Sequence, residues 1–251
     1  MLTILHGDSV QKLAGLDADS IHLIVTSPPY DNLRTYGGCS WDFEGTARQM
    51  FRVLAPGGVV CWVVNDGVEN GSESVTSCEQ KIFFRKQAGF RIHDTMIYQK
   101  RNFSHPEKTR YHQVFEYVFV LSKGAPRVFN PIVDRPNVCA GAIGSLGKNT
   151  FTLRDGTKNV RPRKINGEYG MRHNVWLGRT RGQEEMCVQL LHPAMMPRWL
   201  ARDLIDSWSN EGDVVCDPFA GSGTTCQEAL KLGRKAVAIE VDANYIRLIE
   251  A

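Results

Sequence analysis

Short segments rich in β-branched and aromatic residues recur along the chain, separated by stretches long enough to hold helices. The segments are Thr3–His6, His22–Ser27, Val59–Val64, Asp94–Gln99, Tyr117–Ser122, Val214–Cys216 and Lys235–Glu240. This alternation favours an α/β fold in which helices flank a mostly parallel, twisted sheet. Val59–Val64 is apolar throughout, which is typical of a strand buried on both faces. We therefore predict a Rossmann-like fold.

The composition suits a protein with one hydrophobic core. The chain has 251 residues, of which 42% are hydrophobic, so we expect a single domain over residues 1–251. It lacks long apolar runs, and residues 1–8 lack the basic and apolar parts of a signal peptide, so we expect a soluble, cytoplasmic protein without membrane contact. The seven cysteines form no Cys-x-x-Cys pair and the seven histidines have no ligand spacing, which predicts reduced core thiols and no metal.

The alternation of strands and helices is lost between Gly124 and Gly182. This segment contains nine glycines and four prolines and has no sustained hydrophobic period. Residues 123–182 hold 12 Lys/Arg and 3 Asp/Glu, a charge of +9, whereas the remainder holds 18 and 24, a charge of −6. A basic segment in an acidic remainder is typical of a surface that binds phosphates. The alternative is a solvated basic loop. We interpret the segment as an insertion made of loops and short strands.

Residues 26–30, Thr-Ser-Pro-Pro-Tyr, directly follow a predicted strand. In open parallel sheets, ligands bind beyond the carboxyl ends of the strands. The exocyclic amine of a base is a poor nucleophile, and the Ser27 hydroxyl and the Pro28 carbonyl oxygen can together accept both of its hydrogens. The fixed φ angles of Pro28 and Pro29 hold that carbonyl in place. Tyr30 is placed to stack on a base extruded from a duplex. Taken alone, the motif also fits a Pro-Pro turn that ends a strand.

A second motif, Val214–Thr225, joins a strand to the glycine-rich turn Asp-Pro-Phe-Ala-Gly-Ser-Gly, and the next predicted strand ends in Glu240. Gly221 and Gly223 let a ligand approach the backbone, and Glu240 can accept from ribose hydroxyls. Cys226 replaces the third glycine of the dinucleotide fingerprint, and the lysine of a phosphate-binding loop is absent. These features favour a nucleoside-bearing cofactor without a pyrophosphate over NAD or ATP.

The order of these motifs resembles that of the β-class DNA amino-methyltransferases, which methylate N4 of cytosine or N6 of adenine. In that family an (S/D/N)PP(Y/F/W) motif precedes the cofactor motif, and a target-recognition region lies between them. The resemblance runs from Gly7 to Tyr245 and includes a His-Pro-Ala-x-x-Pro element at residues 192–197. It implies the class I methyltransferase fold with a circularly permuted motif order, S-adenosylmethionine as methyl donor, and double-stranded DNA as substrate. The target-recognition region would be residues 124–185.

The resemblance also implies roles for individual residues. The catalytic residues are expected to be Ser27, Pro28, Pro29 and Tyr30. The residues expected to line the S-adenosylmethionine site, with Glu240 on the ribose and Asp8 near the adenine, are Asp8, Thr26, His192, Asp217, Pro218, Phe219, Gly221, Ser222, Gly223, Thr224 and Glu240.

Further stretches are expected to face the DNA. The residues expected from their charge to bind it are Arg34, Arg161, Arg163, Lys164, Arg172, Arg179 and Arg181. Arg110–Lys123, with His112 and Glu116, resembles the stretch that backs the flipped base in the family. Residues 31–41 resemble its mobile loop, although an ordinary surface loop is the alternative.

The expected reaction is direct transfer of a methyl group to the amine nitrogen, without a covalent enzyme intermediate. The Pro-Cys pair through which cytosine-C5 enzymes attack does not occur in the sequence. The rate would then be gained mainly from orientation and hydrogen bonding.

Several alternatives stay open from the sequence. Serine is commoner at the first motif position of N4-cytosine members and aspartate at that of N6-adenine members, which favours cytosine without excluding adenine. Methylation of RNA or of protein glutamine is a rival activity, although those enzymes usually carry the cofactor motif first. A DNA-binding module without catalysis is a rival of another class. A homodimer and a cognate restriction enzyme are left open, and DNA binding would bring the protein to the nucleoid.

Overall fold

The computed structural model of the protein describes residues 1–29, 41–102, 108–138, 140–141, 150–160, 167–178 and 195–250. Its elements in chain order are β1 (Leu2–His6), α1 (Ser9–Ala14), β2 (Ile21–Thr26), α2 (Phe43–Val53), β3 (Leu54–Val64), β4 (Val68–Glu69), β5 (Ser72–Glu73), α3 (Thr76–Lys86), β6 (Arg91–Lys100), β7 (Phe115–Ser122), β8 (Arg135–Pro136), β9 (Thr150–Thr152), β10 (Lys158–Val160), β11 (Tyr169–Gly170), β12 (Val175–Gly178), α5 (Arg198–Trp208), β13 (Val214–Asp217), α6 (Thr224–Lys231), β14 (Lys235–Glu240) and α7 (Ala243–Glu250). The chain divides into two compact units: a first unit formed by Met1–Asn130 with Asn174–Ala251, and a second formed by Pro131–His173.

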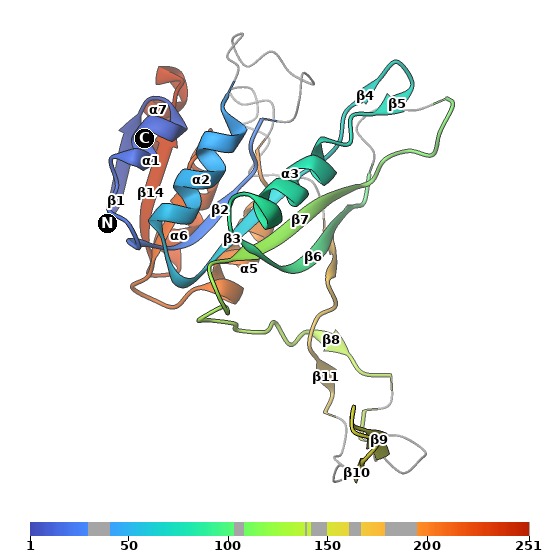
Figure 1. The fold of residues 1–251 in the computed structure, drawn as a ribbon. Helices are drawn as coiled ribbons and strands as arrows, with labels where there is room; N and C mark the ends of the chain where they lie inside the picture. Colours follow the sequence, from blue (N-terminus) through green and yellow to red (C-terminus); the bar gives the residue numbers. More distant parts are fainter. Residues whose placement is uncertain are drawn as a thin grey trace. The chain divides into compact units, whose positions relative to one another are not determined.

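The first unit is built on a sheet whose described strands follow the order β1-β14-β13-β2-β3-β7-β6-β12 (Figure 1). Neighbouring strands are parallel except where β7 pairs with β3 and β6, so β7 alone runs in the opposite direction. This confirms the predicted mostly parallel α/β sheet, and every predicted strand is present. β12 is an additional edge strand inside the segment that the sequence predicted to consist of loops and short strands.

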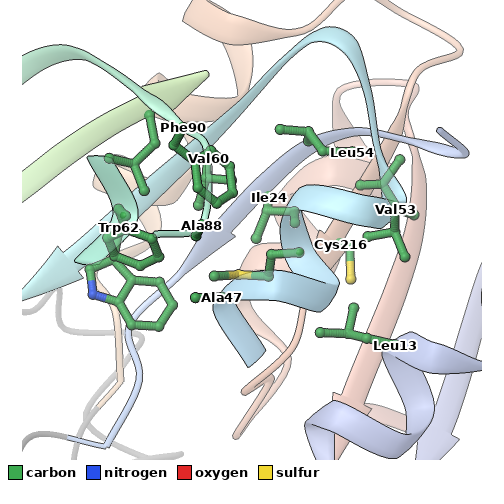
Figure 2. Close-up of a cluster of buried hydrophobic side chains, with 14 of the residues drawn as sticks. Leu13, Ile24, Ala47, Val53, Leu54, Val60, Trp62, Ala88, Phe90 and Cys216 are labelled. Carbon is green, nitrogen blue, oxygen red and sulfur yellow. The ribbon is translucent and has the colours of Figure 1, made fainter. Parts of the chain in front are cut away.

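Helices cover both faces of this sheet. α1, α2 and α3 lie on one face, and α5 and α6 lie on the other (Figure 1). The hydrophobic core beneath α1, α2 and α3 includes Leu13 and Ala47 of the helices, Ile24 and Trp62 of the sheet, and Phe90 from the loop before β6 (Figure 2). Ala47, Ile24 and Trp62 belong to elements that the helical spacing or the apolar runs of the sequence predict, whereas α1 and the loop before β6 were not predicted.

The start of β3 differs from the prediction. The helical spacing of Ala47, Met50, Phe51 and Leu54 in the sequence predicts a helix over Thr46–Leu54, and α2 confirms a helix there. Asp42 caps α2, because its carboxylate accepts from the backbone N–H of Gly45 at 2.9 Å. Pro-Gly-Gly at residues 56–58 is expected to stop this helix, and the predicted strand is Val59–Val64. Instead β3 begins at Leu54, which pairs with Ile21 before a shift in register. Pro56 and the two glycines thus form an irregular start of the strand, where they are tolerated.

The residues that precede and follow the second unit are held within the first unit. Arg127 donates to both carboxylate oxygens of Asp213, at 2.7 and 2.8 Å, and the side chain of Asn130 donates to two carbonyl oxygens at the C-terminal end of α5. At the other end, the carbonyl oxygen of Asn174 accepts from the backbone N–H of Ile97 at 2.8 Å, where β12 joins the sheet. The predicted region 124–185 therefore includes residues that belong to the first unit.

Four described cysteines carry no disulfide. Cys61, Cys216 and Cys226 are buried, and burial raises the pKa of each thiol, whereas Cys78 is exposed. Among the described residues, no group of three or more His, Cys, Asp or Glu side chains is arranged to hold a metal ion. None of the helices in the described part of the chain has the length and apolar character needed to cross a membrane.

Candidate active site

The direction in which the sheet is built reverses between β13 and β2. After β13 the chain passes through α6 to β14 on one side, and after β2 it passes through α2 to β3 on the other side. In open α/β sheets, ligands bind at such a switch point, beyond the carboxyl ends of the strands. Both motifs singled out in the sequence meet there, because Asp217 ends β13 and Ser27 directly follows β2.

A buried hydrogen bond joins the two motifs. The Thr26 hydroxyl donates to Oδ1 of Asp217 at 2.6 Å, and the same oxygen accepts from the backbone N–H of Phe219 at 3.0 Å. Asp217 is 4% exposed, and burial raises its pKa to about 6. Hydrogen bonds from Thr26, Phe219 and Thr225 oppose this rise, and the nearby Glu240 carboxylate adds to it. Asp217 is therefore a buried acid that titrates just below neutral pH.

The carboxylate of Glu240, at the end of β14, holds the glycine-rich turn in place. Its Oε2 accepts from the backbone N–H of Gly221 at 2.7 Å, and its Oε1 accepts from those of Val241 and Asp242, both at 2.9 Å. An ionised carboxylate offers about four acceptor positions. Among the described residues, the backbone groups therefore leave one position on Oε2 for a hydroxyl of a ligand.

The glycine-rich turn requires glycine at two positions. Gly221 and Gly223 lie in the left-handed region, with φ angles of 51° and 79°, which side chains disfavour. Gly223 also caps α6, and a Cβ atom at this position would lie 3.0 Å from the side chain of Ile249. Beside them, the hydroxyls of the buried Ser222 and Thr224 lie 3.3 Å apart. Beyond the end of β13, the glycine-rich turn therefore consists mostly of backbone with few bulky side chains, so a ligand can approach that backbone closely.

Asp8 lies beyond the end of β1, the strand that neighbours β14. The backbone N–H of Gly7 donates to the carbonyl oxygen of Glu240 at 2.8 Å, and Asp8 then caps α1 by accepting from a backbone N–H of its first turn at 3.1 Å. Ser9, which the sequence did not single out, donates to the carbonyl oxygen of Pro218 at 3.0 Å and so ties α1 to the glycine-rich turn. Its only signal in the sequence is its place directly after the helix-capping Asp8.

The residues that follow Thr26 lie just beyond the carboxyl end of β2. Ser27 and Pro29 are half-buried and Pro28 is buried. Close to the glycine-rich turn, the ring of Trp41 makes an edge-to-face contact with that of Phe219, with the centroids 5.0 Å apart. The structure therefore brings together Asp8, Thr26, Ser27, Pro28, Pro29, Asp217, Pro218, Phe219, Gly221, Ser222, Gly223, Thr224 and Glu240 along the carboxyl ends of four adjacent strands.

Most of the predicted DNA-binding residues lie outside the part of the chain that the structure describes. The predicted site residues that lie outside the described residues are Tyr30, Arg34, Arg161, Arg163, Lys164, Arg179, Arg181 and His192. Arg172 is described, in the second unit, where its guanidinium pairs with the carboxylate of Asp134. This hydrogen-bonded guanidinium lowers the pKa of Asp134. A contact between Arg172 and a phosphate would therefore compete with that carboxylate.

Comparisons with known proteins agree with this arrangement. A family model described as DNA methylase, for N6 and N4 methyltransferases, matches residues 21–251. The orphan methyltransferase M.BamHII of Bacillus amyloliquefaciens is 46% identical over 230 residues, covering 90% of this chain and 86% of that protein. The DNA adenine methyltransferase YhdJ of Escherichia coli (strain K12) is 28% identical, covering 98% and 80% of the two chains. The solved structure of the PvuII DNA methyltransferase, named as cytosine-N4-specific, has a TM-score of 0.70 at 20% identity, covering 99% and 85%. The chain belongs to the N6/N4 DNA methylase family and is an S-adenosylmethionine-dependent DNA amino-methyltransferase.

Proposed function

We propose that the protein methylates N4 of cytosine in double-stranded DNA, on a base extruded from the duplex to the Ser-Pro-Pro turn after β2. The observation that supports this most strongly is the hydrogen bond between Thr26 and Asp217, which places the turn beside the glycine-rich motif. Ser27 favours cytosine over adenine, because serine is the commoner first residue of the motif among N4-cytosine enzymes. The rival activities on RNA or protein, and a DNA-binding module without catalysis, receive no support from the comparisons.

The proposed chemistry uses two neutral oxygen atoms. S-adenosylmethionine would supply the methyl group: its methyl–sulfur bond would break, a bond from that carbon to the amine nitrogen would form, and the proton that the amine then loses would pass to solvent. The Ser27 hydroxyl and the Pro28 carbonyl oxygen accept the two amine hydrogens, so that the nitrogen lone pair is drawn out of conjugation with the ring. The gain in rate comes from orientation and preorganised hydrogen bonds.

The residues around the glycine-rich turn fit the cofactor. Glu240 has one acceptor position left for a ribose hydroxyl, and Gly221 brings the backbone close without a side chain. The Asp217 carboxylate, when ionised, complements the positive charge of S-adenosylmethionine. We therefore propose that Glu240 holds the ribose and that Asp217 stabilises the charged end of the cofactor.

The affinity for S-adenosylmethionine should fall as the pH falls through about 6. Because burial raises the pKa of Asp217 to about 6, the free protein holds a proton there at lower pH. A bound cation favours the ionised carboxylate, so binding must release that proton, and affinity should fall by up to about tenfold per pH unit below the pKa. Calorimetric titrations between about pH 5 and 7.5 measure this dependence. Asp217→Asn is the control and should bind weakly with little dependence on pH, whereas an equally pH-independent wild type would contradict the role of Asp217.

The raised pKa of Asp217 also makes the free energy of unfolding depend on pH. A salt-bridged aspartate, whose pKa is lowered, stabilises a protein at higher pH, whereas Asp217 stabilises this protein at lower pH. Because the folded-state pKa lies above the ordinary value of 3.8, folding favours the protonated form. The contribution of Asp217 to the free energy of unfolding is present below that ordinary value and is lost as the pH rises through about 6. Cofactor binding should therefore stabilise the protein more at neutral pH than at pH 5.

The target base is tested by mass spectrometry of nucleosides. Bacterial genomic DNA free of N4-methylcytosine and N6-methyladenine is incubated with the protein and S-adenosylmethionine that carries a deuterated methyl group. We expect labelled N4-methylcytosine. Labelled N6-methyladenine would move the assignment to adenine and leave the amino-methyltransferase activity in place, and label in neither nucleoside would contradict the function.

We also propose that the second unit, Pro131–His173, carries target recognition. The proposal is supported by the basic character of the surrounding segment and by its loop-rich sequence. A deletion of residues 131–173, joined by a glycine-serine linker, keeps Arg127 and Asn130 with their partners in the first unit. It should keep S-adenosylmethionine affinity and lose sequence-specific methylation, as read by sequencing that detects methylated bases. A deletion protein that still methylates only the wild-type sequence would place recognition elsewhere, with residues 31–41 as the next candidate.

A further inference from the structure

The connection between β6 and β7 projects from the same edge of the sheet as the Ser-Pro-Pro turn. We call its described residues, 100–102 and 108–113, the β6–β7 arm. In the described register Thr26 pairs with Trp62 of β3, and the side chain of Gln113 donates to Asn65, just beyond the end of β3, at 3.0 Å. Because adjacent strands are about 4.8 Å apart and β7 and β6 stand two and three strands from β2, the base of the arm lies roughly 10–15 Å across the sheet from the turn that follows Thr26.

Three contacts hold the arm at its base. Lys100 and Glu116 form an ion pair with a nitrogen-to-oxygen distance of 2.5 Å, and both side chains are largely buried. The guanidinium of Arg110 donates to the carbonyl oxygen of Gly71 at 2.7 Å, which ties the arm to the β4–β5 hairpin beyond the end of β3 (Figure 1). With the bond from Gln113, these contacts fix where the arm leaves the sheet.

The arm presents an aromatic ring and cations to solvent. Tyr111 is 100% exposed, and Arg101 and Lys108 are also exposed. Residues 100–113 contain four Lys/Arg and one Asp/Glu, a net charge of +3. Arg101 and Lys108 have no acidic partner among the residues that the structure describes. A single exposed aromatic residue is ordinary, but an exposed ring set among cations is the combination found at nucleic-acid surfaces.

We infer that the β6–β7 arm is a DNA-binding element separate from the second unit. This inference rests on the proposed function, because a DNA duplex that delivers one base to Ser27 has to pass over the neighbouring edge of the sheet. Arg101 and Lys108 bind phosphates that flank the target nucleotide. Tyr111 packs against bases that lose a stacking neighbour when the target base leaves the duplex, which offsets part of the cost of extrusion.

The contribution of the cations is measured from the salt dependence of DNA binding. For the double variant Arg101→Ala/Lys108→Ala, the slope of log affinity against log salt concentration on a mixed-sequence duplex should be less steep by about 1.8, since each phosphate contact contributes about 0.9. The control Arg85→Ala/Lys86→Ala removes the same charge from the last turn of α3, at the opposite edge of the sheet, and should leave the slope unchanged. Equal slopes for the wild type and the arm variant would overturn the phosphate contacts.

The contribution of Tyr111 is measured on genomic DNA. Tyr111→Ala should lower kcat/KM for methylation about 5- to 150-fold, the range that corresponds to the loss of stacking on one base. Tyr111→Phe keeps the ring and should stay close to the wild type. Thermal unfolding and S-adenosylmethionine affinity, which a purely structural effect would change, should be the same in all three proteins. An unchanged kcat/KM for Tyr111→Ala, or an equal loss for Tyr111→Phe, would overturn the stacking role.

The experiments distinguish a wrong DNA-binding role of the arm from a wrong proposed function. If the wild type methylates DNA and the arm variants bind and react like it, only the DNA-binding role of the arm is wrong. If the wild type transfers no methyl group to DNA, the proposed function itself is wrong, whatever the arm variants do.

Discussion

Replacement of Ser27 with alanine should lower kcat for methyl transfer by about 100- to 1,000-fold, the range for removing one preorganised hydrogen-bonding group from a reacting centre. The variant lacks one of the two oxygen atoms proposed to accept the amine hydrogens. Its affinity for S-adenosylmethionine should be unchanged, because the hydroxyl that donates to Asp217 belongs to Thr26. Single-turnover rates with excess DNA measure the first quantity and calorimetry measures the second.

Ser27→Asp is the matched control for this experiment. Aspartate also occurs at this position of the motif, and its carboxylate restores an acceptor. We expect it to recover part of the lost rate. A Ser27→Ala protein that reacts as fast as the wild type would remove Ser27 from the mechanism. A Ser27→Asp protein as slow as the alanine variant would show that the turn tolerates no change there, and would leave the acceptor role unsupported.

Replacement of Glu240 with alanine should weaken S-adenosylmethionine binding about 10- to 150-fold, since a hydrogen bond to a charged group contributes about 1.5–3 kcal/mol. The variant should also be less stable. The backbone N–H groups of Gly221, Val241 and Asp242 all donate to this carboxylate, and its loss leaves them without their acceptor. The expected loss in the free energy of unfolding is at least about 1 kcal/mol, measured by denaturant titration without cofactor.

Two further variants separate the two roles of Glu240, its hydrogen bond to the ribose of the cofactor and its hydrogen bonds from the backbone of the glycine-rich turn. Glu240→Gln keeps one acceptor oxygen and should be intermediate in both measurements. Asp242→Asn removes a neighbouring negative charge, while the backbone N–H of Asp242 can still donate to Glu240, and it should change affinity little. Unchanged cofactor affinity in Glu240→Ala would refute the placement of the ribose, even if stability fell.

The sheet was predictable where the hydrophobic pattern was continuous. Val59–Val64 and Lys235–Glu240 are fully or almost fully apolar apart from their ends, and both are central strands. Short strands were expected in the segment that contains β12, but its position and its pairing with the main sheet were not predicted, because β12 has four residues, ends in glycine and owes its conformation to pairing with β6. The early start of β3 at Leu54 was missed because pairing with β2 overrides the preference of Pro-Gly-Gly for a turn.

The residue types of the candidate site were also predictable, but their contacts were not. Thr26 and Asp217 are 191 positions apart in the sequence. Only the order of the strands in the sheet brings the Thr26 hydroxyl oxygen to 2.6 Å from Oδ1 of Asp217. Nor does the sequence show that Glu240 already accepts three backbone hydrogen bonds, which leaves it room for one ribose hydroxyl where two were conceivable. The raised pKa of Asp217 depends on burial, which a sequence motif does not specify.

A crystal structure of the protein with S-adenosylhomocysteine would show directly whether residues 27–29 and the glycine-rich turn form one active site. We predict a ribose hydroxyl hydrogen-bonded to Oε2 of Glu240, the backbone of Gly221 against the nucleoside, and the sulfur atom facing the Ser27 hydroxyl and the Pro28 carbonyl oxygen. A nucleoside bound away from Glu240, or a sulfur atom directed away from Ser27, would contradict the assignment of this switch point as the site of methyl transfer.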